Sequence, residues 1–125
     1  MTRGEEFERL QFQSVREKNN SLLNTFIHSD CTYESKSVPT ALKGLVPTAI
    51  KGRDEVNIMW ENLWENFDAG TQKVIYEDEN QVHVHHHDKL KSTEAFFSVT
   101  QKVTIKDGKI FHHQEEYQDS DHGPI

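Results

Sequence analysis

Ala95–Tyr117 reads AFFSVTQKVTIKDGKIFHHQEEY and contains the strongest structural pattern in the sequence. Apolar and polar residues alternate before Asp107-Gly108, which is the period of a β-strand with one buried face. An Asp-Gly pair readily adopts the positive φ angles of a type I′ turn. The stretch therefore predicts a hairpin of two long antiparallel strands that turns at Lys106–Lys109. The predicted inner face of its first strand holds Ala95, Phe97, Val99, Gln101, Val103 and Ile105.

Further alternations between residues 74 and 88 precede the hairpin and predict two more strands. In the second of these, Val82 and Val84 share a face with His86 and Asp88, because side chains two residues apart point the same way. The opposite face holds His83, His85 and His87. Histidines at this spacing can chelate a metal ion, with His112 as a further ligand. The sequence has neither a pair of cysteines nor an HExxH pattern, so we expect no metal.

The N-terminal half has the periodicity of helices. From Glu5 to about His28, apolar residues recur at spacings that fit one helix followed by a shorter one. Cys31–Ser35 alternates like a strand, and Lys36–Lys51, with two prolines, predicts a long excursion with little regular structure. A further helix begins at Gly52–Asp54 and ends before Gly70. Its apolar stripe is Val56, Trp60, Leu63 and Phe67, widened by Met59 and Trp64. Helices followed by a meander predict an α+β domain whose helices cover one face of an antiparallel sheet.

The composition limits the function classes. With 125 residues, the chain predicts a single domain over 1–125. Its 14 basic and 21 acidic residues give a net charge of −7, which argues against binding nucleic acid or a membrane surface. A lone cysteine, Cys31, and the lack of an apolar leader or spanning stretch predict a cytoplasmic protein. The glycines are scattered and form no phosphate-binding loop, so we expect no cofactor.

In order and spacing, these segments resemble the nuclear transport factor 2-like superfamily, which includes ketosteroid isomerase and SnoaL-type polyketide cyclases. The resemblance covers essentially the whole chain. It rests on Asp30–Ser35, Ile50–Asp54, Lys106–Ile110 and a last strand that ends in Tyr117 and Asp119. It implies a cone-shaped, curved antiparallel sheet wrapped around the N-terminal helices, a cystatin-like fold. It also implies an apolar pocket between sheet and helices that suits a small hydrophobic molecule.

When the site residues of ketosteroid isomerase are matched to this sequence one by one, the match predicts the same fold but not the same reaction. The general-base aspartate falls on Ser35, the tyrosine donor falls on Gln11, and the second, protonated acid falls near Gln101. Serine cannot take an α-proton at neutral pH, so we do not expect ketosteroid isomerase activity. These three positions are still expected to contact a ligand.

The inward face of the last strand has two alternatives. They are Phe111, His113, Glu115 and Tyr117 on one face, and Ile110, His112, Gln114 and Glu116 on the other. We favour the first, because it buries two aromatic rings and because ketosteroid isomerase-like strands after this hairpin point the same way. A β-bulge would reverse the choice partway along the strand.

Two pairs of residues are candidates for catalysis: His113 with Glu115, and His86 with Asp88. In each, a carboxylate would orient an imidazole that titrates near neutral pH. We expect His113 and Glu115 to be the more reactive pair, and local hydrogen bonding at strand ends is the alternative for both. The expected ligand contacts are Gln11, Tyr33, Ser35, Trp60, Phe97, Gln101 and Tyr117, although core packing is the alternative for the aromatic members.

The sequence thus predicts a protein that binds a small hydrophobic ligand, with an acid-base isomerase, cyclase or lyase activity as one form of that function. The alternative is a noncatalytic oligomerisation or protein-interaction module, as in nuclear transport factor 2 itself. An interior filled by Phe97, Tyr117 and Trp60 would favour the module. A homodimer through the outer sheet face is also expected, because Phe96 and the outward histidines lie there, and acid should weaken it.

Overall fold

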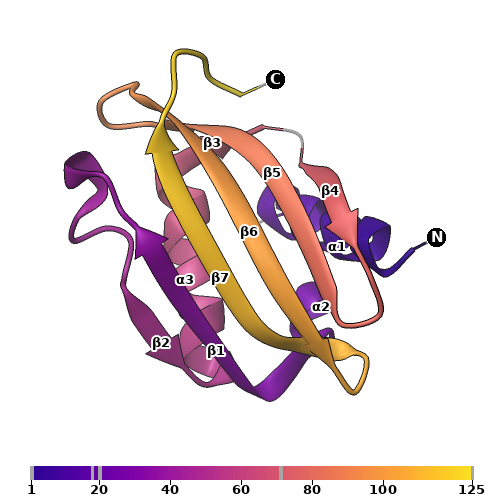
Figure 1. Cartoon of the computed structure of the whole chain (residues 1–125). Coiled ribbons are helices and arrows are strands. Elements are labelled where there is room, and N and C mark those ends of the chain that lie inside the picture. Colours follow the sequence, from indigo (N-terminus) through magenta and orange to yellow (C-terminus); the bar gives the residue numbers. More distant parts are fainter. Residues whose placement is uncertain (1, 18, 20, 71, 125) are drawn as a thin grey trace.

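The computed structural model describes residues 2–17, 19, 21–70 and 72–124. One curved sheet wraps around the helices, which lie together on its concave side (Figure 1). The strands are β1 (Ile27–Ser37), β2 (Ala49–Lys51), β3 (Phe67–Ala69), β4 (Lys73–Glu77), β5 (Gln81–Leu90), β6 (Phe96–Lys106) and β7 (Lys109–Asp119). The helices are α1 (Arg3–Glu17), α2 (Ser21–Asn24), α3 (Arg53–Asn66) and the short 3-10 helix η1 (Thr40–Leu42). The strand order is β2-β1-β7-β6-β5-β3, and β4 also pairs with β5.

The sheet is mixed, so the predicted all-antiparallel sheet is wrong in one pairing. β1 runs parallel to β7, whereas every other described pairing of strands is antiparallel. The meander from β5 to β7 fixes the direction of β7, because each tight turn reverses the chain. β1 has β2 on one edge and docks its other edge on β7, far away in sequence. That pairing does not leave a local signal in the sequence.

The predicted hairpin is confirmed at its turn. Asp107 has a φ of 54° and Gly108 a φ of 73°, the two positive values that a type I′ turn requires. The two strands then pair antiparallel from Lys106 with Lys109 to Phe97 with Asp119.

A β-bulge near this turn settles the direction of the last strand. Thr104 pairs with His112 and Ile105 with Ile110, which leaves Phe111 as an extra residue in β7. The prediction that Phe111 points inward is therefore wrong: the bulge leaves it half-buried, and Ile110 is buried instead. Beyond the bulge the favoured face is confirmed, since the buried residues there are His113, Glu115 and Tyr117.

The N-terminal elements differ from prediction mainly at their ends. The predicted helical region to about His28 runs too far, because β1 already begins at Ile27, which pairs with Ile110 of β7. β1 continues to Ser37, past the predicted Cys31–Ser35, and the excursion after it contains η1 and the short strand β2. Tertiary pairing outweighs local periodicity at these positions.

α3 begins after Gly52, whose φ of 98° suits glycine, and it ends one residue before Phe67. Phe67 begins β3 and is therefore not helical as predicted, but it stays buried. The buried face of α3 packs against the concave face of the sheet, and its members are Val56, Met59, Trp60 and Leu63. None of the helices in the described ranges has the length and apolar content needed to cross a bilayer.

Candidate functional site

Three adjacent strands bring a group of polar side chains into the core. Gln101 of β6 pairs with Val84 of β5 and with Glu115 of β7, so the concave faces of the three strands meet at this level. The two-residue period then brings further polar residues to the same face. The buried polar residues of these strands are His86, Asp88, Gln101, His113 and Glu115. Burial of charged groups is costly unless they are paired, so their contacts define the site.

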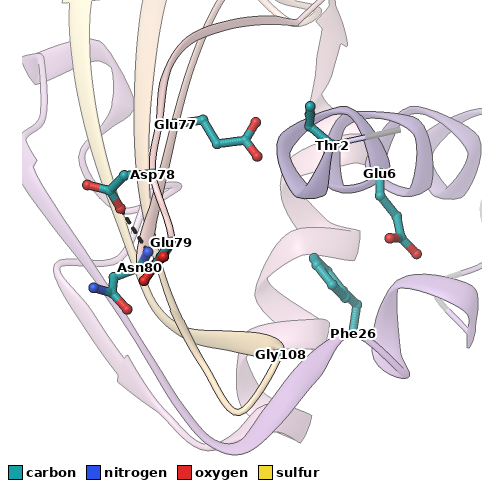
Figure 2. Close-up of a pocket in the computed structure, with 8 residues that line it drawn as sticks. All are labelled: Thr2, Glu6, Phe26, Glu77, Asp78, Glu79, Asn80 and Gly108. Carbon is teal, nitrogen blue, oxygen red and sulfur yellow. Dashed lines mark hydrogen bonds between the residues drawn. The ribbon is translucent and has the colours of Figure 1, made fainter.

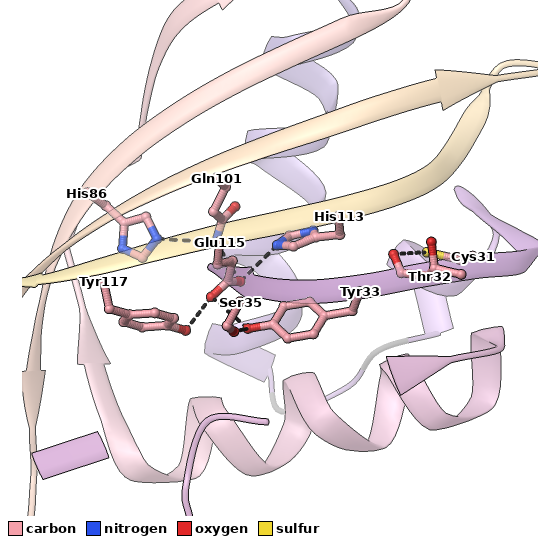
Figure 3. A network of polar contacts seen from close by, with 9 residues as sticks. All are labelled: Cys31, Thr32, Tyr33, Ser35, His86, Gln101, His113, Glu115 and Tyr117. Atoms are coloured by element: carbon pink, nitrogen blue, oxygen red, sulfur yellow. Dashed lines mark hydrogen bonds and ion pairs between the residues drawn. The ribbon is translucent and has the colours of Figure 1, made fainter. Parts of the chain in front are cut away.

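The carboxylate of Glu115 is the centre of this network (Figure 3). Its Oε1 accepts hydrogen bonds from His113 Nε2 at 2.8 Å and from Gln101 Nε2 at 3.4 Å. Its Oε2 accepts a hydrogen bond from Tyr33 at 3.3 Å and a short one from Tyr117. Burial alone would raise the pKa of Glu115, but the contacts with His113 and Tyr117 outweigh it and hold the pKa below its usual range. Glu115 is therefore a fixed anion and a weak base.

The two tyrosines are donors to this anion. Burial, together with the charge of Glu115, raises the pKa of Tyr33 and of Tyr117, so both hydroxyls keep their protons. Tyr33 also lies 2.7 Å from the hydroxyl of Ser35. Since Tyr33 donates to Glu115, Ser35 donates to Tyr33, and the chain of hydrogen bonds reaches β1.

His86 and Asp88 form a second buried pair on β5. Nδ1 of His86 lies 2.5 Å from Oδ1 of Asp88, and its Nε2 lies 3.2 Å from Nε2 of Gln101. An amide nitrogen can only donate, so Nε2 of His86 accepts and the ring proton is on Nδ1, facing Asp88. Burial lowers the pKa of His86, but the charges of Asp88 and Glu115 outweigh it and raise the pKa above its ordinary value. His86 is thus a base oriented by a carboxylate.

A small cavity lies between these strands and α3. Its volume of about 30 Å³ admits about two water molecules. All of the residues that line it are buried except Trp64 and Ala69, which form its rim. The lining residues are Gln11, Trp60, Leu63, Trp64, Phe67, Ala69, Gln72, His86, Asp88, Gln101, Glu115 and Tyr117.

Seven of the predicted site residues line this cavity: Gln11, Trp60, His86, Asp88, Gln101, Glu115 and Tyr117. The other four predicted site residues do not line the cavity, but they contact residues that do. Tyr33 and Ser35 reach Glu115 through hydrogen bonds, and Phe97 packs in the core against Phe67. His113 is fully buried, stacked on Tyr33 and edge-on to Trp60, with ring centroids 5.5 and 4.9 Å apart.

Five residues that line the cavity are not among the predicted site residues. Leu63, Trp64 and Phe67 belong to the predicted apolar stripe, and their spacing from Trp60 carried a signal for the same face. Ala69 and Gln72 lie in and just after the short strand β3. Residues at the ends of short strands have no periodicity that would have found them.

A much larger hollow, of about 1110 Å³, lies outside the network (Figure 2). It is lined by Thr2, Glu6, Phe26, Glu77, Asp78, Glu79, Asn80 and Gly108, none of them a predicted site residue. Asp78 is used within the β4–β5 turn, where its Oδ1 accepts the backbone N–H groups of Asn80 and Gln81, both at 2.8 Å. This hollow is a solvated acidic surface.

The outward histidines of β5 lie on the opposite side of the sheet from the cavity. His85 contacts Thr100, and His87 contacts Ser120 and the ring of His122 at 4.1 Å between centroids. Partial burial is the main reason why the pKa values of His85 and His87 are lowered. In the part of the chain that the structure describes, no three His, Cys, Asp or Glu side chains are placed to hold a metal ion.

No family model and no curated protein matches the chain. Solved structures do match it over nearly its whole length. TerC, co-crystallized with polyporic acid, has a TM-score of 0.73 at 12% identity, with 94% of this chain and 92% of TerC covered. A SnoaL-like polyketide cyclase candidate from Mesorhizobium loti has a TM-score of 0.62 at 15% identity, with 92% and 98% covered.

A nuclear transport factor 2-like protein from Burkholderia pseudomallei has a TM-score of 0.74 at 10% identity, with 94% of this chain and 92% of that chain covered. Identities this low establish the fold alone, since one scaffold of this kind hosts unrelated activities. The curved sheet, the helices on its concave side and these matches agree with the fold that the sequence predicts. The chain therefore has the nuclear transport factor 2-like fold, which SnoaL-like proteins share.

Proposed function

We propose that the protein binds a small organic molecule inside the cone and exchanges a proton with it through His86. The observation that carries this proposal is the His86–Asp88 pair, which lines the cavity with an accepting Nε2 at the site. An imidazole with a carboxylate on its other nitrogen is a suitable general base, because the carboxylate stabilises the imidazolium that forms.

The proton would move in two steps. A ligand C–H group takes the place of Gln101 at Nε2 of His86, while Gln101 keeps its hydrogen bond to Glu115. The C–H group then gives its proton to Nε2, while Asp88 holds Nδ1–H. The imidazolium then returns the proton to another atom of the same ligand, which is the balance of an isomerase or cyclase. Glu115 is not the base in this proposal, because its oxygens are held by four donors. His113 acts as a positioning residue through Glu115, since it does not line the cavity.

The walls also support an apolar body for the ligand. Trp60, Leu63 and Phe67 form one side of the cavity, opposite the polar strands. The volume of about 30 Å³ holds only a small group, so a larger ligand has to extend past the rim at Trp64. TerC, which shares this fold, was crystallized with an organic acid, and that match supports a small molecule as the kind of ligand.

Binding can be tested through the two tryptophans, which both line the cavity. We expect members of a panel of small aromatic alcohols, acids and amines to change the tryptophan fluorescence and to raise the melting temperature, since a ligand that binds the folded state stabilises it. If no member of the panel does either, the proposed function is wrong.

Proton transfer is tested on the compounds that bind. In D₂O, the protein should exchange deuterium into a carbon position of a bound compound, and proton NMR follows the loss of that C–H signal. His86→Gln should slow this exchange by roughly 10²–10⁴-fold, the range for a lost acid-base group. His85→Gln is the matched control, because it changes the neighbouring residue on the opposite face of β5. Equal exchange by both variants would remove His86 from the mechanism.

The noncatalytic module is the second candidate, and the filled interior favours it. Phe97, Trp60 and Tyr117 are all buried, and little free volume remains among them. In that case the network around Glu115 serves stability alone. A noncatalytic module would show no ligand-dependent change in fluorescence, and this result separates the two candidate functions.

A further inference from the structure

Four side chains that line the cavity each have a buried polar atom with no hydrogen-bond partner among the described residues. These atoms are Oε1 of Gln11, Nε1 of Trp60, Oε1 of Gln72 and Oε1 of Gln101. The residues are between 1% and 7% exposed. Buried polar groups in folded proteins are nearly always paired, so four unpaired atoms around one small cavity call for a molecule that pairs with them.

Three of the four atoms are amide oxygens, which only accept hydrogen bonds. The orientation of the Gln101 amide is set by its neighbours, because its Nε2 donates to Glu115 and to His86. A molecule that satisfies the three oxygens has to bring N–H or O–H donors. The remaining atom, Nε1 of Trp60, is a donor and can take a water or an oxygen of the ligand.

The charges around the cavity point the same way. Asp88 and Glu115 are carboxylates, and His86 is the only basic side chain among the described lining residues. Tyr117 stays a neutral hydroxyl. His86 offsets part of the charge of Asp88, but two carboxylates and three acceptor oxygens outnumber it, so a cation is favoured over an anion.

The aromatic wall suits the apolar body of the ligand. The rings of Trp60 and Trp64 stack with centroids 6.3 Å apart and an interplanar angle of 18°. Aromatic rings beside the rim of the cavity suit a ligand with an apolar body. Trp64 and Ala69 are the least buried lining residues, so we place the opening of the cavity beside them.

We infer that the ligand is a small primary amine whose ammonium group enters the cavity and whose apolar body leaves it past Trp64 and Ala69. The three N–H groups of an ammonium match the three unpaired amide oxygens in number, and a head group of this size fits a volume of about 30 Å³. This inference rests on the proposed function, because it names the class of molecule that the same cavity takes.

The test compares three probes of nearly equal size: benzylamine, benzyl alcohol and benzoate. Tryptophan fluorescence titration at neutral pH should show benzylamine binding at least about tenfold more tightly than benzyl alcohol. Benzoate should bind most weakly of the three. If benzyl alcohol or benzoate binds as tightly as benzylamine, the amine inference is wrong and the proposed function stands. If neither these probes nor the wider panel bind, both are wrong.

Variants then locate the head group. Glu115→Gln should weaken benzylamine by about tenfold or more and leave benzyl alcohol nearly unchanged. The control is Glu116→Gln, the adjacent residue on the opposite face of β7. Equal weakening of both probes would show a merely structural effect and contradict the inference.

If Glu115→Gln fails to fold, Gln72→Leu tests the amine inference instead. It removes an unpaired acceptor near the rim, so the free protein should melt no lower than the parent chain. Its affinity for benzylamine should still fall severalfold, while Gln118→Leu, at an exposed position, should leave that affinity unchanged. Unchanged binding of benzylamine by Gln72→Leu would overturn the role of the amide oxygens.

Discussion

Glu115 shows how a single buried charge can organise a core. The carboxylate has no cationic partner from Lys or Arg in any described contact, and hydrogen bonds from an imidazole, an amide and two phenols stabilise it instead. Such donors are aimed at one point by three different strands. Loss of the anion would remove the acceptor that all four donors share.

We therefore expect Glu115→Ala to lower the free energy of unfolding by about 3–5 kcal/mol, the range for removing one partner of a buried charged group. Glu116→Ala should change it by less than about 0.5 kcal/mol, as for most surface substitutions. Urea denaturation followed by circular dichroism measures both. A loss for Glu115→Ala no larger than that for Glu116→Ala would contradict the account of the network.

The raised pKa of His86 predicts a pH dependence with a definite sign. A group whose pKa is higher in the folded protein stabilises it fully below the unfolded value and loses that contribution as the pH rises through the folded value. The stability difference between the parent chain and His86→Gln should therefore shrink as the pH increases above neutrality. Denaturation at a series of pH values measures it.

NMR titration provides the direct check on the same residue. The His86 ring should titrate above the ordinary histidine value, and His85, whose pKa burial lowers, should titrate below it. A pKa of His86 below that of His85 would contradict the inference that Asp88 stabilises the protonated ring of His86.

Among the elements, the bulge in β7 determines which side chains of this strand face the core. Ile110 and His113 both point inward although they are three residues apart, because Phe111 is the extra residue between them. Outside the core, Phe111 packs edge-on to His28 and lies under the ammonium of Lys106. The bulge also bends the strand, as bulges do, and so contributes to the curvature of the sheet.

Deletion variants test this reading of the bulge. Deleting Phe111 restores a simple two-residue alternation and should leave His113, Glu115 and Tyr117 inward, so the variant should fold with reduced stability. Deleting Gln114 instead turns Glu115 and Tyr117 to the outer face and should prevent folding, because a one-residue slip exchanges the faces of a strand. Thermal melts followed by circular dichroism distinguish the two. Equal melting temperatures would contradict the assigned register.

The elements that sequence reasoning found are those with strong local periodicity. The alternation in β5 and β6 placed His86, Asp88 and Gln101 correctly, and the Asp-Gly turn placed the hairpin. The bulge could not be placed, because both faces of β7 carry aromatic or apolar residues beside polar ones. Gln72 was missed because a residue between two short strands follows no period.

At the scale of the whole molecule, the outer sheet face is the place where we propose that two copies pair. Phe96 offers less apolar surface for pairing than expected. A Cβ on Gly123 would lie 2.6 Å from the Phe96 ring, which shows that the C-terminal segment packs closely on that ring. Ile75 and Tyr76 of β4 are instead 58% and 48% exposed. Of these two, Tyr76 lies beside the outward His83, with ring centroids 5.0 Å apart.

Light scattering coupled to size exclusion should find a dimer at neutral pH that weakens in acid. Partial burial lowers the pKa values of His83, His85 and His87, so their protonation, and with it dissociation, should begin below the ordinary titration range of histidine. A monomer at neutral pH would contradict the pairing, and a dimer that persists in acid would contradict the histidine effect.

The parallel pairing of β1 with β7 also has a consequence for folding during synthesis on the ribosome. β1 is made before the other strands of the sheet, but its inner neighbour β7 is made after all the other described strands. Until then β1 can pair only with β2, and its other edge stays open to unwanted partners. Contacts between distant parts of a chain form slowly, so the cone closes only after β7 has been made. A nascent chain stalled before residue 109 would therefore lack the middle of its sheet and depend on chaperones for protection.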